Sequence, residues 1–212
     1  YEHEVRSSAR ILSLDFFNAS ARSKLESVCE SPDCGVIRRT TEFVAALESA
    51  EFARQLDEVI DYGLGLCRRE YAADHDCNQR LCRGRRYSRA DACRLLCWDN
   101  DEHGTINGYS FKTNDWPIFV TYTKADEVSE SVKYEDAFES PSRFIWFSQN
   151  NRSLKSKDFQ KLSAFDATTQ RIHLFIKKDD SEGQDHYYLG TLSFSLGDIT
   201  EELKPDSSGK AA

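Results

Sequence analysis

The sequence predicts an α+β protein in which a helical N-terminal region precedes a small antiparallel, barrel-like β domain. Up to about residue 66, apolar residues recur with the period of a helix, about 3.6 residues. From residue 108 onward they alternate or form short β-branched and aromatic runs between turn-forming residues. We therefore expect a helical region over 1–86, a β domain over 87–196 and a tail over 197–212, of which 206–212 is expected to be disordered.

Three helices are expected. The first lies within 7–29. The second begins after Thr40, whose hydroxyl suits an N-cap, and runs to Gly63 and Gly65, which either end it or mark a contact between helices. The third begins after Ser88, another suitable N-cap.

Five strands follow, each bounded by turn-forming residues. They are expected at 108–112, 116–122, 144–147, 172–177 and 186–194. A charged loop over 124–133 follows the second strand, and the acidic turn 179–183 joins the last two. Strands this short and closely spaced predict a small barrel or a strongly bent sheet.

The composition limits the classes of function. A formal net charge of −8 argues against a general DNA-coating protein, although a local basic face remains compatible with it. No apolar run approaches the roughly 20 residues of a membrane span, so no membrane partner is expected. Seven cysteines without a signal-peptide pattern indicate a reduced, cytoplasmic setting. The lack of any Met, including at position 1, suggests a segment of a longer protein.

Two loosely spaced cysteine pairs lie near a histidine: Cys29, Cys34, Cys77, Cys82 and His75. Structural zinc sites usually draw on pairs two to four residues apart, so the spacing here is a weak match. We favour free, partly buried thiols and expect no metal and no cofactor. Cys93 and Cys97, one helical turn apart, are expected in the core.

Arginines gather in one stretch: Arg80, Arg83, Arg85, Arg86, Arg89 and Arg94. We expect Arg85, Arg86 and Arg89 to contact phosphates beside the helix start at Ser88. The alternative is a solvated loop whose arginines pair with acids elsewhere.

A strand of aromatic residues runs directly into amides, a hydroxyl and an arginine. With an aromatic neighbour, the candidate pocket residues are Tyr122, Trp146, Ser148, Gln149, Asn150 and Arg152. Amides can pair with base edges, arginine can hold a phosphate, and aromatic rings can stack on bases. The alternative is a turn in which Asn and Ser bond their own backbone. Aromatic residues are also abundant elsewhere in the β region, and most of them are expected in the core.

Catalytic motifs are missing from the sequence. There is no phosphate-binding loop of the G-x-x-x-x-G-K type, no G-x-S-x-G and no H-E-x-x-H. The acid pairs 135–136 and 179–180 are adjacent residues, which a strand would point to opposite faces. His173 and His186 are interpreted as structural. We expect no catalytic residues and no enzymatic activity in this chain.

Several short motifs follow one another through the second half of the chain: Tyr87-Ser88-Arg89, Leu95-Leu96-Cys97-Trp98, Gly108-Tyr109, 117–122, Tyr134-Glu135-Asp136, 140–150, 174–178 and Tyr187-Tyr188-Leu189-Gly190. In this order they resemble the domain of unknown function at the C-terminus of certain bacterial superfamily-II (DEAD/DEAH-box) helicases, which often carry an N-terminal phospholipase-D-like nuclease domain. Similar domains are joined to HNH-type nucleases. The resemblance covers 87–192. The helical part before it resembles, more weakly, the region linking the helicase core to that domain. An extra residue in 148–153, relative to S-Q-N-R-T, leaves the register after Asn150 open.

The resemblance implies a role in restriction or antiviral defence, with a helicase core in the same parent chain as partner. It implies recognition of modified DNA, either a methylated base, usually adenine, or a phosphorothioate backbone. A PUA-like or SRA-like barrel is one form the fold could take. A second function is a protein-interaction or oligomerisation module without DNA affinity, which the net charge of −8 favours. A nuclease is disfavoured by the missing metal-carboxylate motif.

Overall fold

A computed structural model describes residues 2–30, 36–71, 80–122, 136–149 and 152–201. The chain divides into two compact units that interleave along the sequence. The first unit combines Tyr1–Cys82 with Ala90–Thr105, and the second combines Arg83–Arg89 with Ile106–Ala212. Each unit is described by itself below.

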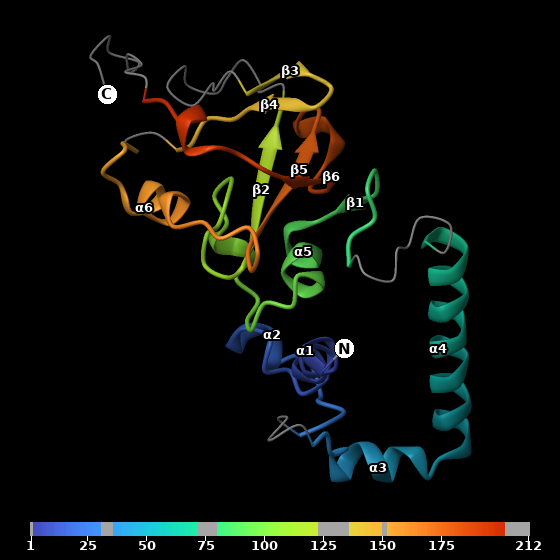
Figure 1. Cartoon of the computed structure of the whole chain (residues 1–212). Helices are drawn as coiled ribbons and strands as arrows, with labels where there is room; N and C mark the ends of the chain where they lie inside the picture. The colour runs from blue at the N-terminus through green and yellow to red at the C-terminus, as the bar shows by residue number, and fades with distance from the viewer. Residues whose placement is uncertain (1, 31–35, 72–79, 123–135, 150–151, 202–212) are drawn as a thin grey trace. The chain divides into compact units, whose positions relative to one another are not determined.

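The first unit is helical (Figure 1). Its elements are α1 (Glu2–Leu12), α2 (Ala19–Arg22), α3 (Thr41–Leu47), α4 (Ala50–Tyr71), most of α5 (Arg89–Leu95) and a 3-10 turn (His103–Thr105). The expected helix within 7–29 is split, because the chain turns at Leu14 with φ 67° and inserts Phe16 into the core, 1% exposed. α3 begins within the predicted segment 40–43, and Thr40 is its N-cap, accepting from the Phe43 N–H. Gly63 and Gly65 do not end a helix, since α4 continues to Tyr71.

The core of the first unit forms around Phe16 and α5. Ala92, Cys93 and Trp98 are at most 3% exposed there. The Phe16 carbonyl accepts from the Asp101 N–H at 2.7 Å, which fixes the turn after α1 to the segment after α5. Cys93 is buried as predicted, whereas Cys97 is only half-buried. Burial, with nearby Asp101, raises the pKa of the Cys93 thiol to about 12. This thiol is therefore a packing group.

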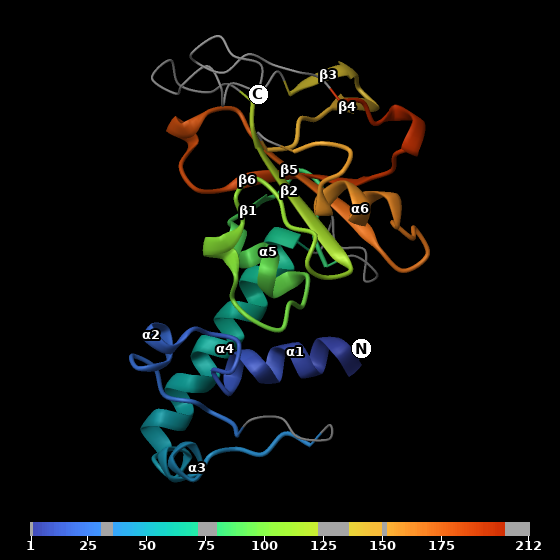
Figure 2. The same cartoon turned by 90° about the vertical axis from the view of Figure 1, so that its left-hand side faces the viewer.

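The second unit contains a curled four-stranded sheet in the order β1-β6-β5-β2, with a two-stranded β3-β4 sheet at one end (Figures 1 and 2). The strands are β1 (Arg86–Tyr87), β2 (Asp115–Thr121), β3 (Ala137–Ser140), β4 (Arg143–Ile145), β5 (Arg171–Lys177) and β6 (His186–Leu192). The predicted α+β class with a bent sheet is confirmed. One pairing differs from the antiparallel expectation: β2 and β5 run parallel, so the sheet is mixed.

The parallel pairing follows from the long crossover between β2 and β5. This crossover includes β3, β4 and α6 (Lys157–Ser163), which begins at the N-cap Ser156. It lies over one face of the sheet, which we call the crossover face, and packs its partly buried Phe144, Trp146, Leu162 and Phe165 there. The crossover face itself carries Trp116, Ile118, Val120, Ile172, Leu174 and Ile176. On the opposite face, the rings of Phe119 and Phe175 stack with centroids 4.6 Å apart.

Four predicted strands are present with shifted ends, at β2, β4, β5 and β6. The segment 108–112 forms no regular strand, and its Tyr109 makes isolated bridges to Asn107 and Ile118. β1 and β3 were not predicted. The expected loop 124–133 lies outside the described residues. Among the helices that are described, none combines the length and apolar character required to cross a membrane.

Candidate nucleic-acid interface

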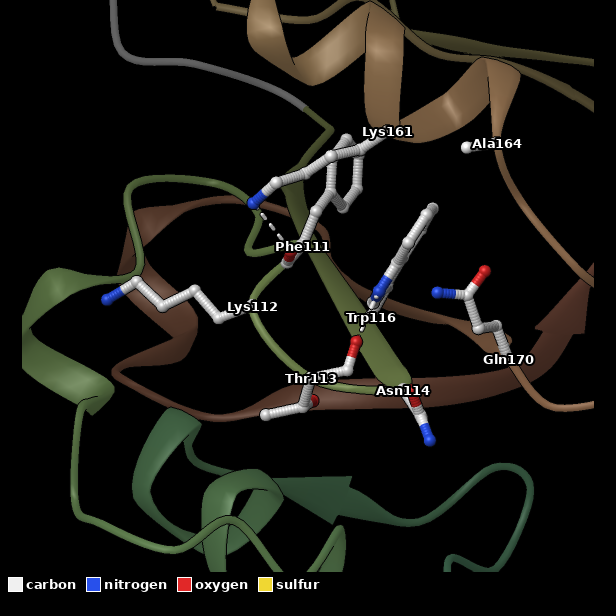
Figure 3. Close-up of a pocket in the computed structure, with 8 residues that line it drawn as sticks. All are labelled: Phe111, Lys112, Thr113, Asn114, Trp116, Lys161, Ala164 and Gln170. Atoms are coloured by element: carbon white, nitrogen blue, oxygen red, sulfur yellow. Dashed lines mark hydrogen bonds between the residues drawn. The ribbon is translucent and has the colours of Figure 1, made fainter.

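A cavity of about 320 Å³ opens at the edge of the crossover face (Figure 3). It is lined by Phe111, Lys112, Thr113, Asn114, Trp116, Lys161, Ala164 and Gln170. Its floor is aromatic, because the rings of Phe111 and Trp116 lie 4.7 Å apart at 34° and are 6% and 2% exposed. Its remaining walls carry ammonium, amide and hydroxyl groups. The volume is at the lower end of the range for small-ligand sites, about 300–1,000 Å³.

The tight turn before β2 forms one wall of the cavity. The Thr113 hydroxyl donates to the Asp115 carbonyl at 2.8 Å and accepts from the Asp115 N–H, so it closes the turn locally. The Trp116 indole N–H donates to the Thr113 carbonyl at 2.5 Å. These bonds hold the Trp116 ring in place and leave the exposed Asn114 amide at the tip of the turn.

α6 forms the second wall. Its inner residue Leu162 packs on the sheet core, which points Lys161 and Ala164 toward the cavity. The Lys161 ammonium donates to the Phe111 carbonyl at 2.8 Å (Figure 3). An ammonium has three donors, so this bond leaves two for a ligand.

The loop from α6 to β5 forms the third wall, with Gln170 at its end. Asp166 accepts from the backbone and side chain of Thr168, and these bonds lower the pKa of its carboxyl. The Asp166 N–H donates to the Gln170 Oε1 at 2.9 Å, which leaves the amide NH₂ of Gln170 facing the Trp116 side of the cavity (Figure 3).

Three of the sequence-predicted residues lie together beside this cavity. Trp146 contacts the Tyr109 ring edge-to-face at 5.1 Å and Phe111 at 6.4 Å. Arg152 bonds the Gln149 Oε1 at 3.0 Å. Gln149 in turn donates to the Asn107 carbonyl at 2.5 Å. Both ends of the Gln149 amide are thus bonded within the protein.

Asp158 of α6 joins this cluster to the aromatic floor. Its Oδ2 accepts from the Tyr109 hydroxyl at 2.7 Å and pairs with the Arg152 guanidinium at 3.1 Å. Burial, followed by the hydrogen bond to Asp158, raises the pKa of Tyr109 to about 12, so this hydroxyl is a donor at neutral pH. Ser148 is half-buried next to Gln149, and Asn150 lies outside the described residues.

The predicted phosphate contacts lie elsewhere in the second unit. The Arg89 guanidinium lies 5.6 Å from the Phe119 ring centroid, on the face opposite to the crossover, because β2 alternates its side chains. Arg86 donates to the Glu182 carbonyl at 2.6 Å and lies over the Tyr187 ring. Arg85 is half-buried. Burial lowers the pKa of Arg89.

Tyr122 and the two histidines belong neither to the cluster around Trp146 nor to the group of Arg85, Arg86 and Arg89. Tyr122 follows β2, is 47% exposed, and its N–H bonds the Lys177 carbonyl. His173 is 7% exposed and bonds Asp115 at 2.9 Å and Tyr188 at 3.1 Å, while His186 is 3% exposed. Both histidines are thus buried inside the second unit.

The cysteines and histidine considered for zinc, a site that the sequence disfavours, are only partly covered by the described residues. Cys34, His75 and Cys77 lie outside the described residues, whereas Cys29 and Cys82 are buried and are not in disulfides. In the part of the chain that the structure describes, no group of three or more His, Cys, Asp or Glu residues could hold a metal ion.

Sequence reasoning missed the cavity residues Lys112, Asn114, Lys161 and Gln170. Lys112 was assigned to a strand, whereas it precedes a tight turn. Lys161 lies in the short helix α6, and Gln170 ends the loop that follows it. The start of this helix carries a signal that could have been detected, Ser156 followed by Asp158.

Two family models match successive parts of the chain. Residues 1–72 match the family described as Domain of unknown function (DUF8090). Residues 81–212 match the family described as Domain of unknown function (DUF3427), which confirms the expectation of a domain of this kind in the C-terminal half. No curated protein matches the chain. Because the second match spans more than half of the sequence, the chain belongs to the DUF3427 family.

Proposed function

We propose that the second unit is a DNA-binding accessory module of a restriction or anti-phage helicase–nuclease, and that it takes up a modified nucleotide in the cavity of Figure 3. The observation that carries this proposal is the combination of an aromatic floor with two lysines and two amides in one cavity. The helicase core as partner rests on the sequence resemblance alone.

The lysines suit a phosphate. Lys161 is held in place by its bond to the Phe111 carbonyl, which leaves two of its three donors for a ligand, and Lys112 is the second lysine that lines the cavity. Because the chain carries a net charge of −8, contact with DNA would depend on a few such cations. We therefore expect a shallow salt dependence, with a slope of about −0.9 per phosphate contacted.

The floor and the amides suit a base or a sulfur-substituted phosphate. Asn114 and the NH₂ of Gln170 can bond a base edge, and the Trp116 ring supplies apolar contact for a methyl group or a sulfur atom. A cavity of about 320 Å³ is small relative to a duplex. The proposal therefore places one nucleotide, flipped out or at a strand end, in the site.

The test is fluorescence anisotropy of three labelled duplexes of one sequence, at fixed low salt: unmodified, carrying N6-methyladenine, and carrying a phosphorothioate linkage. We expect one modified duplex to bind more tightly than the unmodified one. Lys161→Ala with Lys112→Ala should weaken binding at least tenfold. Lys157→Ala is the matched control, because Lys157 is an exposed lysine of the same helix that does not line the cavity.

Two outcomes would overturn the proposal. If no duplex binds, the second unit is not a DNA reader. If Arg85→Ala with Arg86→Ala abolishes binding while the lysine variants do not, the cavity is not the site. A melting temperature equal to that of the natural chain would exclude unfolding of a variant as the cause.

The proposal makes this chain a binding module without catalysis. Incubation of labelled DNA with the chain in the presence of Mg²⁺ or Mn²⁺ tests this point. If DNA cleavage activity co-purifies with the protein, the chain is a nuclease and this proposal is wrong.

A further inference from the structure

Apolar and small residues gather along one side of α4, which we call the α4 stripe: Phe52, Ala53, Leu56, Val59, Ile60, Gly63, Leu64, Leu66 and Cys67. At about 100° per residue, these nine positions fall within an arc of roughly 160°. The charged residues Glu51, Arg54, Glu58, Asp61 and Arg69 lie on the other side. A stripe of this width normally faces a protein core.

The α4 stripe is largely uncovered. Val59 is 68% exposed, Ile60 49% and Leu64 49%. In the described part of the chain, α3 is the element that packs against α4, and it reaches the first turn through an edge-to-face contact of Phe43 with Phe52. The stripe from Val59 to Cys67 therefore presents apolar surface to solvent.

An exposed stripe of this kind needs a partner. Isolated helices are marginally stable in water, and most helical stability in proteins comes from packing of the apolar side. The 22 residues of α4 contact little besides α3 in the described chain, so propensity and intrahelical ion pairs such as Arg54–Glu58 are its main internal support. Such exposed pairs contribute only about 0.3–0.5 kcal/mol each.

We propose that the α4 stripe packs against the same stripe of a second copy of this chain, with the two helices antiparallel and crossing at Gly63. The charges at the edge of the stripe support this occupant. Asp57 and Arg68 flank the stripe on the same side, six and five positions from Gly63, respectively. An antiparallel crossing at Gly63 thus brings Asp57 of one copy level with Arg68 of the other, whereas a parallel pair places each charge level with its own copy.

Gly63 fits the crossing point. A Cβ built at this position meets nothing within 4 Å, so a second helix can approach the backbone closely there. Glycine inside a helix costs about 1 kcal/mol relative to alanine. A close helix contact gives a physical reason for a glycine at the centre of the stripe.

Sedimentation equilibrium of the whole chain over a concentration series tests the pairing. We expect a mass of twice 24.3 kDa that falls on dilution. Val59→Glu should weaken the dimer at least tenfold. Tyr62→Glu is the matched control, because Tyr62 is 69% exposed on the same helix but lies outside the stripe. A monomer at every concentration, or equal weakening by both variants with helicity retained in circular dichroism, would overturn the proposal.

Charge exchange tests the orientation. Asp57→Arg should weaken the dimer by repulsion from Arg68 of the second copy, and adding Arg68→Asp should restore it. Failure of the double variant to restore dimerisation contradicts the antiparallel arrangement. Because α4 lies outside the second unit, these variants should leave DNA affinity per chain unchanged, so this proposal and the DNA-binding proposal fail independently.

Discussion

The two faces of the four-stranded sheet bury different kinds of side chain. The crossover face is apolar throughout β2 and β5, with Ile118 and Leu174 at its centre, and it opens at its edge into the cavity. The opposite face surrounds the Phe119–Phe175 stack with His173, His186 and Lys177, all at most 9% exposed. One face of the sheet thus buries apolar side chains, and the other buries aromatic and polar ones.

The difference indicates which polar groups have hydrogen-bond donors left for a ligand. On the opposite face, two of the buried polar groups are bonded inside the protein: the His173 ring bonds Asp115 and Tyr188, and the Lys177 ammonium bonds the Gly183 carbonyl at 3.0 Å. Buried polar groups without partners are costly, so these groups are committed to the fold. At the edge of the crossover face, Lys161 keeps donors available. We therefore place ligand binding at that edge.

The largest expected effect comes from the aromatic centre of the opposite face. Phe175 is fully buried and contacts the rings of Phe119, Tyr87 and Tyr188. Phe175→Ala should lower the free energy of unfolding by about 3–5 kcal/mol, measured by urea denaturation. Ile118→Val on the crossover face, a loss of one methyl group, should cost about 0.5–1.5 kcal/mol. A loss below about 1 kcal/mol for Phe175→Ala would mean that the opposite face is not packed as described.

The next effect is a dependence on pH through His186. Burial, with the charges of Lys177 and Arg89, lowers its pKa from 6.5 to about 4. The unfolded chain therefore binds a proton near pH 6.5 that the folded chain does not accept until about pH 4. The neutral, buried His186 therefore stabilises the fold fully above pH 6.5. As the pH falls from 6.5 toward 4, the free energy of unfolding decreases by on the order of 3 kcal/mol.

Urea denaturation between pH 7 and pH 4 measures this loss. His186→Gln removes the titrating ring, so its stability should fall less steeply over the same range. Equal slopes for the variant and the natural chain would show that His186 is not buried in its neutral form.

The smallest expected change in the free energy of unfolding comes from removing one partner of a polar pair, and it should be larger for a buried pair than for an exposed one. Asp115→Ala removes the partner of the His173 Nε2, whose side chain is 9% exposed, and should cost about 1–3 kcal/mol. Asp180 pairs with Lys177 but is 63% exposed, so Asp180→Ala should cost less than about 1 kcal/mol. Equal losses for the two variants in urea denaturation would remove the distinction between the network and a surface pair.

The sequence predicted most of the elements because their signals are local. The Thr40 cap involves residues three positions apart, β2 contains a continuous apolar run, and the apolar run of β5 is interrupted by His173 alone. Such runs are typical of strands covered on both faces, which is common in parallel pairs. The direction of pairing depends instead on the packing of the whole crossover. β1 was missed because two residues, Arg86 and Tyr87, are too few to show alternation.

The candidate site was partly predictable. Trp146, Gln149 and Arg152 were expected together and belong to one cluster beside the cavity, although none of them lines it. Their partners were not predictable, because Gln149 bonds the carbonyl of Asn107, which is 42 residues away in sequence. The cavity walls come from a turn, a helix of seven residues and a loop, none of which has a strong period. Long-range proximity of this kind is decided by packing.

The parallel pairing of β2 with β5 also has a kinetic consequence. β5 and β6 are joined by the short turn around Asp179–Gly183, so this hairpin can form early, on a timescale of about 1–10 μs. β2 ends at Thr121 and β5 begins at Arg171, so their pairing must close a far longer loop. Contacts of high sequence separation slow folding. We expect the docking of β2 onto a preformed β5-β6 hairpin to limit the refolding rate of the second unit.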